Sequence, residues 1–302
     1  MPPNPFVRFA FDPTPESPRR TTLELIRDEH WAHLVRRVTK APEQVQSKTI
    51  VNLDGQNTEA YPLHYLCKKR NVPPALVELI VDACKEASRT PDAELHSLPI
   101  HIACEHDASV GVLDVLIRAY PEGLTITDAD GNLPIHYACS LESCESALYL
   151  LKACPESVMT KNKKGQTPLH LASSRYDVCP ELVEELIQLN QDACKTRDWQ
   201  GRLPIHSACM WKADTKVIQM LLEAYPQSVR QQDSHHHTPY GICRKVVHLD
   251  HHDSTVKLLR SYQLKHGDLL NRSKDLMRYQ AEKLSDSLGI HAHKSFRYAN
   301  AG

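Results

Sequence analysis

The sequence predicts an all-α solenoid of about six helix-loop-helix repeats. The block Leu-Pro-Ile-His-x-Ala-Cys occurs three times, starting at Leu98, Leu133 and Leu203, with near copies at Tyr61 and Thr167. The motif prolines lie 37, 35, 34 and 36 residues apart, and a degenerate sixth copy follows after 35 more. A period of roughly 20 to 50 residues is typical of repeat proteins in which each unit packs on its neighbours. These prolines define units one to six: Pro62, Pro99, Pro134, Pro168, Pro204 and Pro239.

Composition makes some partner classes less favoured. The 302 residues include 36 Lys and Arg against 37 Asp and Glu, so no global positive charge attracts nucleic acid or an anionic membrane. No stretch approaches the roughly 20 apolar residues of a membrane helix. The proline-rich residues 1–20 lack the apolar run of a signal peptide. We therefore expect a cytoplasmic or nuclear protein that is a monomer and uses no cofactor.

Each unit is predicted to start with a turn and a short helix that begins at the motif proline. Proline is tolerated in the first helical turn, because the N–H that it lacks would be unpaired there. The residues before the motif have turn chemistry, as in Asp128-x-Asp130-Gly131. An Asp or Asn bonds the backbone of such a turn, and Gly accepts positive φ.

The second helix of each unit is predicted from apolar residues at helical spacing, as in Leu113, Leu116 and Ile117. The loop between the two helices varies in length, as surface loops can. In contrast, the spacing from the helix end to the next turn Asp or Asn is nine residues in every unit, which predicts a connection of fixed geometry. These pairs are Ala83 and Asp92, Ala119 and Asp128, Ala153 and Asn162, Leu189 and Asp198, and Ala224 and Asp233.

The segment Thr167-Pro168-Leu169-His170-Leu171-Ala172 resembles the Thr-Pro-Leu-His-x-Ala block of the ankyrin repeat. The resemblance covers residues 50–264, with a longer period than the usual 33 and with Cys where the family commonly has a second Ala. It implies that the motif histidine bonds backbone near the turns and ties adjacent units together. These histidines are His64, His101, His136, His170 and His206, and Gly241 takes the position in unit six.

We divide the chain into a disordered proline-rich tail (1–20), an ankyrin-repeat solenoid (21–264), a capping helix (265–290) and a flexible tail (291–302). Residues 23–41 are expected to be the second helix of a leading half repeat, followed by an insertion at 52–55 that lengthens the first turn. Ser17 stands in a pattern typical of proline-directed kinase sites. The apolar stripe of the last helix favours a cap, with a coiled-coil partner helix as the alternative: Leu270, Met277, Ala281, Leu284 and Leu288.

Pairs of His and Cys at i and i+3, such as His101 and Cys104, could suggest a thiol nucleophile with its base. The pair recurs at the repeat period, whereas an enzyme needs one such constellation with further groups around it. We therefore interpret the cysteines as reduced packing residues and expect no catalytic residues, with a Cys/His enzyme as the least favoured alternative. The motif cysteines are Cys67, Cys104, Cys139 and Cys209.

A second group of histidines could hold a metal: His235, His236 and His237, with His248, His251 and His252 further on. On the repeat pattern the two parts lie at opposite ends of a helix of about ten residues, roughly 15 Å apart. They should not share an ion, so no metal site is predicted.

Partner binding is predicted on the concave face, because the ankyrin resemblance implies that turn tips and first helices form that surface. Units two and three place acidic residues there, including Glu105, Asp107, Asp130 and Glu142, and units four and five place basic and aromatic residues there. We expect a protein or peptide partner, with nucleic acid as the alternative. The candidate contact residues are Lys163, Lys164, Arg175, Tyr176, Trp199, Arg202, Met210, Trp211 and Lys212.

Overall fold

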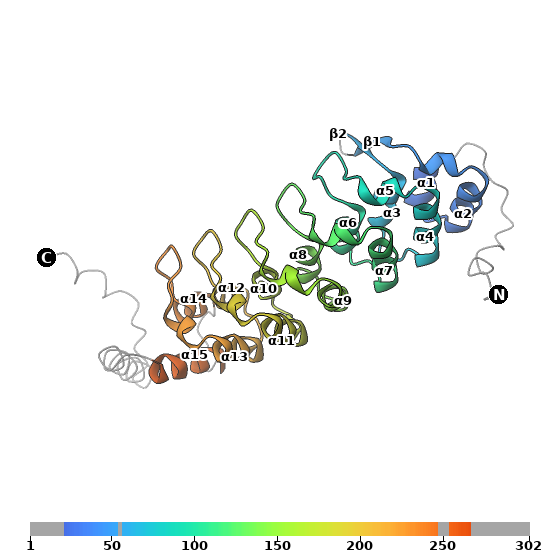
Figure 1. Cartoon of the computed structure of the whole chain (residues 1–302). Helices are drawn as coiled ribbons and strands as arrows, with labels where there is room; N and C mark the ends of the chain where they lie inside the picture. Colours follow the sequence, from blue (N-terminus) through green and yellow to red (C-terminus); the bar gives the residue numbers. More distant parts are fainter. Residues whose placement is uncertain (1–20, 54–55, 247–253, 267–302) are drawn as a thin grey trace, which may run out of the picture.

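A row of stacked helix pairs forms the molecule, with the turn loops projecting together along one edge (Figure 1). The computed structural model describes residues 21–53, 56–246 and 254–266. The predicted all-α solenoid is confirmed, and within the described ranges six helix pairs follow a leading pair. None of the described helices is both long and apolar enough to cross a membrane.

The N-terminal segment forms two helices where the sequence predicted a single one. Helix α1 (Thr22–Arg27) begins with a capping box, in which the Thr21 hydroxyl accepts from the Glu24 N–H and the Glu24 carboxylate accepts from the Thr21 N–H. The chain then turns at Glu29, whose φ is 57°, and continues as α2 (Trp31–Lys40). The predicted half repeat is therefore a helix pair, because the left-handed residue separates two helices that one apolar pattern had joined.

The insertion before unit one is a β-hairpin. After the 3₁₀ helix η2 (Pro42–Val45), β1 (Thr49–Leu53) pairs antiparallel with β2 (Gln56–Ala60), with Thr49 opposite Ala60. The hairpin stands in the same row as the turn loops of later units (Figure 1). The Thr-Ile-Val run followed by Asp-Gly was a hairpin signal that the sequence prediction treated only as a longer turn.

The first helix of every unit begins at the motif proline, as predicted. The second helices of units one to five end at the predicted residues, so the nine-residue connection holds throughout the stack. In units two to five this connection contains a 3₁₀ helix. The elements of units one to three are α3 (Pro62–Cys67), α4 (Pro74–Ala83), α5 (Glu86–Arg89), α6 (Pro99–Glu105), α7 (Val110–Ala119), η3 (Pro121–Thr125), α8 (Pro134–Cys139), α9 (Glu145–Ala153) and η4 (Pro155–Met159).

The later units repeat this order. Unit four comprises α10 (Pro168–Ala172), α11 (Pro180–Leu189) and η5 (Gln191–Lys195). Unit five comprises α12 (Pro204–Met210), α13 (Thr215–Ala224) and η6 (Pro226–Arg230), and unit six comprises α14 (Pro239–Val246) and α15 (Ser254–Lys265).

One continuous hydrophobic core runs along the stack, from Leu25 to Leu259. Each first helix packs on the first helix of the next unit, and each second helix on the next second helix. The motif leucine or isoleucine and the motif cysteine are buried between units, as with Ile135 and Cys139. Because neither face of a middle unit is covered without its neighbours, the stack is stabilised as a whole.

Several predicted segments lie outside the described residues. These are the tail at 1–20 with Ser17, the flexible tail at 291–302, and the capping helix at 265–290 except for its first two residues, 265 and 266. They remain predictions.

Candidate protein-binding surface

The turns before the motif are held by an Asp or Asn side chain. The Asp198 Oδ1 atom accepts hydrogen bonds from the N–H groups of Gln200 (2.9 Å) and Arg202 (2.8 Å). Gly201, with a φ of 69°, completes that turn. Equivalent pairs of hydrogen bonds form in the other turns, at Asp92, Asp128, Asn162 and Asp233.

Neighbouring turn tips are tied to each other through the backbone. The Lys163 N–H donates to the Asp130 carbonyl at 2.9 Å, and the Trp199 N–H donates to the Lys164 carbonyl at 3.0 Å. The Ser234 N–H donates to the Gln200 carbonyl at 2.9 Å in the same way. The tips of units three to six therefore form one braced edge on which side chains have fixed places.

The motif histidines tie each unit to the next. In His136, Nδ1 accepts the Leu133 N–H at 3.0 Å, so the ring proton lies on Nε2 and can be donated to the carbonyls of Thr160 (3.2 Å) and Gln166 (3.3 Å). Both carbonyls follow the second helix and lead into the next unit. The same Nε2-to-carbonyl contact is made by His64, His101, His170 and His206. These contacts confirm the role that the family resemblance implied.

Burial keeps the motif histidines neutral. It lowers the pKa of His64 and of His206 to about 4, with nearby carboxylates and backbone hydrogen bonds offsetting part of the effect. Burial lowers the pKa of His101, His136 and His170 as well. A ring that is neutral can accept at Nδ1 and donate at Nε2, which is the arrangement that the tether requires.

The candidate contact residues separate into two groups. The tip group consists of Lys163, Lys164 and Trp199, at the turn tips of units four and five. Trp199 is 71% exposed, although its backbone is fixed to Lys164. Both lysines are exposed as well. An aromatic side chain presented on a braced backbone loses little conformational entropy when it binds.

The loop group lies at the other end of the first helices. It consists of Tyr176, in the loop between α10 and α11, with Trp211 and Lys212, in the loop between α12 and α13. Tyr176 is 74% exposed and Trp211 is 55% exposed. Met210, the last residue of α12, is half-buried and packs against the hydrophobic core. The two groups therefore flank the first helices of units four and five from both ends.

The two candidate arginines are part of the frame. The Arg175 guanidinium donates to the Ser140 carbonyl at 2.5 Å and pairs with Asp177 at 2.8 Å, and its side chain is 18% exposed. The Arg202 Nε atom lies 3.9 Å from the buried Asp233 carboxylate. Each arginine thus joins two units, and its charge is matched within the chain.

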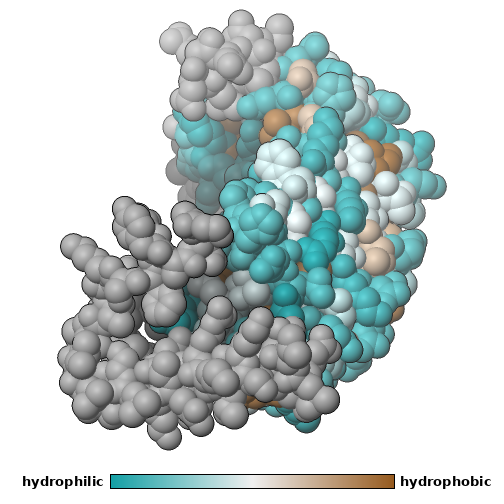
Figure 2. Space-filling view, turned by 90° about the vertical axis from the view of Figure 1, so that its left-hand side faces the viewer, coloured by the Kyte–Doolittle hydropathy of each residue, from teal (hydrophilic) through white to brown (hydrophobic). Residues whose placement is uncertain are grey.

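Exposed aromatic side chains are concentrated in these two units. Among the residues whose burial the structure describes, the large hydrophobic residues with more than a third of their surface exposed are Tyr176, Trp199 and Trp211, with Leu95, Met159 and Leu189 at 36 to 39%. The side of the molecule in Figure 2 is mostly hydrophilic, with small, separate hydrophobic areas. Three aromatic residues left this far exposed are not explained by packing, and aromatic residues are enriched in binding hot spots.

Acidic residues occupy the corresponding positions in earlier units. Glu105 and Asp107 lie at the end of α6, Glu142 lies in the loop after α8, and Asp130 lies at the tip of unit three. Along these positions the side chains change from acidic in units two and three to aromatic and basic in units four and five.

The repeated His and Cys pairs are arranged as packing residues. Cys67, Cys104, Cys139 and Cys209 are at most 1% exposed, and burial raises the pKa of the Cys67 thiol to about 12. An activated nucleophile needs a lowered thiol pKa. The motif histidines direct Nε2 to backbone carbonyls. Nothing in this pair favours nucleophilic catalysis.

The histidine triplet lies in the last described turn. The rings of His235 and His237 stack with centroids 6.1 Å apart, and His237 lies 3.6 Å from Asp233. His248, His251 and His252 lie outside the described residues. Within the described ranges no three His, Cys, Asp or Glu side chains gather as metal ligands would.

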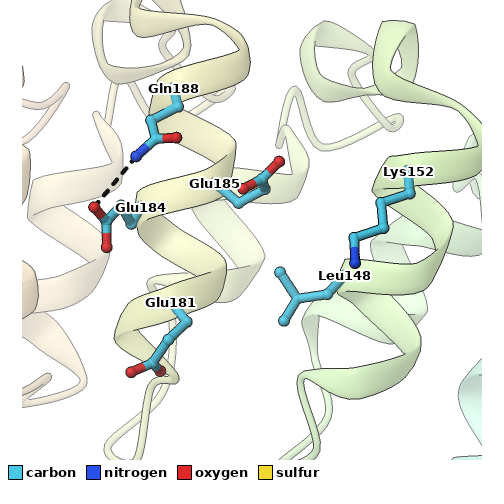
Figure 3. A pocket seen from close by; sticks show the side chains of 6 residues that line it. All are labelled: Leu148, Lys152, Glu181, Glu184, Glu185 and Gln188. Atoms are coloured by element: carbon cyan, nitrogen blue, oxygen red, sulfur yellow. Dashed lines mark hydrogen bonds between the residues drawn. The ribbon is translucent and has the colours of Figure 1, made fainter.

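A shallow pocket opens between the second helices α9 and α11 (Figure 3). Lys152 of α9 and Glu185 of α11 both point toward it, while Gln188 donates to Glu184 at 3.2 Å beside it. Leu148 and Glu181 complete its lining. The pocket lies between second helices, and Leu148 is the one hydrophobic residue in its lining.

Comparison with known proteins identifies the repeats. Residues 135–233 match the family model of ankyrin repeats in three copies. An ankyrin repeat-containing protein of Schizosaccharomyces pombe is 26% identical over 131 residues, which are 43% of this chain and 56% of that protein. The human transient receptor potential cation channel subfamily A member 1 is 35% identical over 101 residues, which are 32% of this chain and 8% of the channel.

The fold has a counterpart among solved structures. The ankyrin repeat domain of Bcl-3, a member of the IkappaB protein family, matches with a TM-score of 0.55 and 20% identity, over 81% of this chain and 100% of that domain. The chain spans about half of the yeast relative and a small part of the channel, so these similarities concern the repeats and not whole proteins. Together with the repeated motif and its histidine tethers, they establish that the chain is an ankyrin-repeat protein.

Proposed function

We propose that this chain is a non-catalytic adaptor or scaffold, which binds a partner protein or peptide through units four and five. The observation that carries the proposal is the exposure of Tyr176, Trp199 and Trp211, which lie in the turn tips and inter-helix loops at the two ends of the first helices of units four and five. Ankyrin repeats are generally protein-interaction modules, which supports the same class of function.

The proposed partner segment lies along the first helices and contacts both groups. It places apolar side chains against the aromatic residues and carboxylates near Lys163 and Lys164. A basic end of the same segment fits the acidic residues of units two and three, Glu105, Asp107 and Glu142. Such charge complementarity fixes orientation and speeds association more than it adds affinity.

Protein binding is favoured over nucleic-acid binding because several basic side chains of units four and five donate hydrogen bonds within the chain. Lys161 donates to the Arg197 carbonyl at 3.1 Å, and Arg197 donates to the carbonyls of Gly201 and Gln232. Arg175 is paired within the chain as described. Lys161, Arg175 and Arg197 therefore brace the repeats, which leaves fewer cations to neutralise phosphates.

A comparative pull-down from native lysate tests the proposal. The double variant Trp199→Ala/Trp211→Ala should lose the partners that the wild-type chain recovers, because both aromatic anchors are truncated. The matched control is Met159→Ala/Leu189→Ala, which removes exposed hydrophobic residues outside the proposed surface and should recover the same partners as wild type. Equal recovery by the two double variants would contradict the proposal.

A further inference from the structure

The row of turn tips continues from Trp199 into unit six. The Ser234 N–H donates to the Gln200 carbonyl at 2.9 Å, and the Ser234 hydroxyl donates to the same oxygen atom. His235 and His236 follow Ser234 in the chain, and all three residues are exposed. The tip of unit six is therefore fastened to the residue next to Trp199, and it presents two imidazole rings on the same braced edge.

His236 occupies a backbone position that glycine fills in the preceding units. The third residue after the turn Asp or Asn is Gly131, Gly165 or Gly201 in units three to five, with a φ between 69° and 76°. His236 has a φ of 60°, and a residue with a Cβ is strained in this left-handed region. Among the described residues no further tip follows unit six, so a side chain has room there, but glycine would relieve the strain. The fold alone therefore does not account for a histidine at this position.

A neighbouring ring fixes the direction of His235. The rings of His235 and His237 stack with an interplanar angle of 13°. His237 is held from two sides, because Lys245 donates to its Nε2 atom at 2.6 Å and its Nδ1 atom lies 3.6 Å from the Asp233 carboxylate. His237 thus belongs to the frame of unit six, and His235 is the exposed outer ring of the stacked pair.

The tips of units four to six present no exposed carboxylate. The turn residues Asp198 and Asp233 are buried, and one oxygen atom of each accepts backbone N–H groups of its own turn. The tip of unit three differs, because it carries the exposed Asp130. Cations or N–H donors therefore stand on both sides of Trp199. The tip residues are Lys163 and Lys164 in unit four, Trp199 and Gln200 in unit five, and Ser234, His235 and His236 in unit six.

We propose that the partner segment continues across the tip of unit six, and that this part of it is an acidic peptide with an apolar centre. Its apolar side chains lie on Trp199, and carboxylates on one side pair with Lys163 and Lys164. Carboxylates on the other side accept N–H hydrogen bonds from His235 and His236. The inference rests on the proposed function, to which it adds unit six and the chemistry of the partner. Because packed helices lie roughly 10 Å apart, three tips span about six extended residues.

Fluorescence anisotropy with a labelled peptide tests the site on the full chain. The probe is Glu-Glu-Glu-Leu-Leu-Glu-Glu-Glu, and the reference probe has glutamine in place of every glutamate. We expect the acidic probe to bind at least about tenfold more tightly than the reference, with an affinity that falls as the salt concentration is raised. A wild-type chain that does not prefer the acidic probe would overturn the inference. The proposed function is tested separately, by the pull-down with the tryptophan variants.

Variants of unit six separate a binding role from a structural one. His236→Glu should weaken binding of the acidic probe at least about tenfold, because a carboxylate replaces a donor. His236→Gly should also weaken binding, while the midpoint of urea denaturation stays the same or rises, because glycine relieves the left-handed strain. The matched control is His96, an exposed histidine in the turn of unit two with a φ of 51°, and His96→Glu should bind the probe like wild type.

The same titrations show which proposal fails. Binding of the acidic probe that is equal in His236→Glu and in wild type, but lost in Trp199→Ala, would overturn the inference about unit six. It would leave the proposed surface on units four and five in place.

Discussion

The backbone N–H of Trp199 donates a 3.0 Å hydrogen bond to the carbonyl oxygen of Lys164, and so joins the turn tips of units four and five. The most exposed tryptophan of the described residues is thus held on one of the braced positions of the solenoid. This bond connects the scaffold to the proposed function, because it fixes the place of Trp199 relative to Lys163 and Lys164.

Gly165→Ala should disturb this connection. Gly165 has a φ of +72°, and an added Cβ would lie 2.9 Å from the Trp199 nitrogen. We expect a loss of about 1–3 kcal/mol in the free energy of unfolding, from strain in a left-handed residue, together with weaker partner recovery. Urea denaturation measures the first effect. Gly241→Ala is the control, because Gly241 is helical and its Cβ would meet its nearest atom at 3.4 Å; stability should hold or increase there.

His136→Ala should destabilise the whole stack. The substitution leaves the buried Leu133 N–H and the carbonyls of Thr160 and Gln166 without their partner. Unsatisfied buried groups of this kind cost about 1–3 kcal/mol each, so we expect a loss of at least about 2 kcal/mol in urea denaturation. The exposed His235 provides the comparison, and His235→Ala should change stability by less than about 0.5 kcal/mol. Similar small losses in both variants would contradict the tether.

Stability should fall in mild acid. The folded-state pKa of His64 and of His206 is about 4, below the value of 6.5 in an unfolded chain, so the unfolded chain binds protons first as the pH falls. The stabilisation from neutral rings is complete above pH 6.5 and is lost progressively between pH 6.5 and 4. At 1.36 kcal/mol per pKa unit, each of these two residues contributes on the order of 3 kcal/mol.

Urea denaturation at a series of pH values measures this effect. His206→Gln should flatten the decrease between pH 6.5 and 4, because it removes one of the two most strongly shifted groups. A free energy of unfolding that stays constant across this range would show that the pKa values of His64 and His206 are the same in the folded and unfolded chain.

Reversing the charge of the tip lysines should weaken binding without altering the fold. Lys163→Glu/Lys164→Glu places two carboxylates where the partner is proposed to carry its own. We expect slower association and a smaller salt dependence, measured with a partner recovered by the wild-type chain. The exposed Lys216 on α13 serves as control. Binding that responds equally to Lys216→Glu would indicate a general charge effect and not a local contact.

Much of the fold could be predicted because each unit repeats the same local chemistry. The motif proline, such as Pro134, begins the first helix of each unit. The turn residue Asp128 accepts hydrogen bonds from residues that are close to it in the sequence. The constant spacing from Ala119 to Asp128 reflects one connection that the structure repeats. Local signals failed where the chain departs from the repeat, at the Glu29 turn and at the β1–β2 hairpin.

The candidate surface was harder to predict, because it depends on which side chains the stack itself uses. Arginine is common in binding surfaces, but Arg175 and Arg202 each contact a residue of a neighbouring unit. Comparing equivalent positions in successive units is the signal that could have identified these contacts.

Site-specific photo-crosslinking tests the proposed surface most directly. A benzophenone amino acid is placed at Gln200 or Lys212, next to Trp199 and Trp211, and for comparison at Gln188 or Gln227, which are exposed on α11 and η6. If units four and five bind the partner, irradiation in lysate should give a covalent adduct of defined mass from the first two positions and not from the second two. Adducts from Gln188 or Gln227, with none from Gln200 or Lys212, would contradict it.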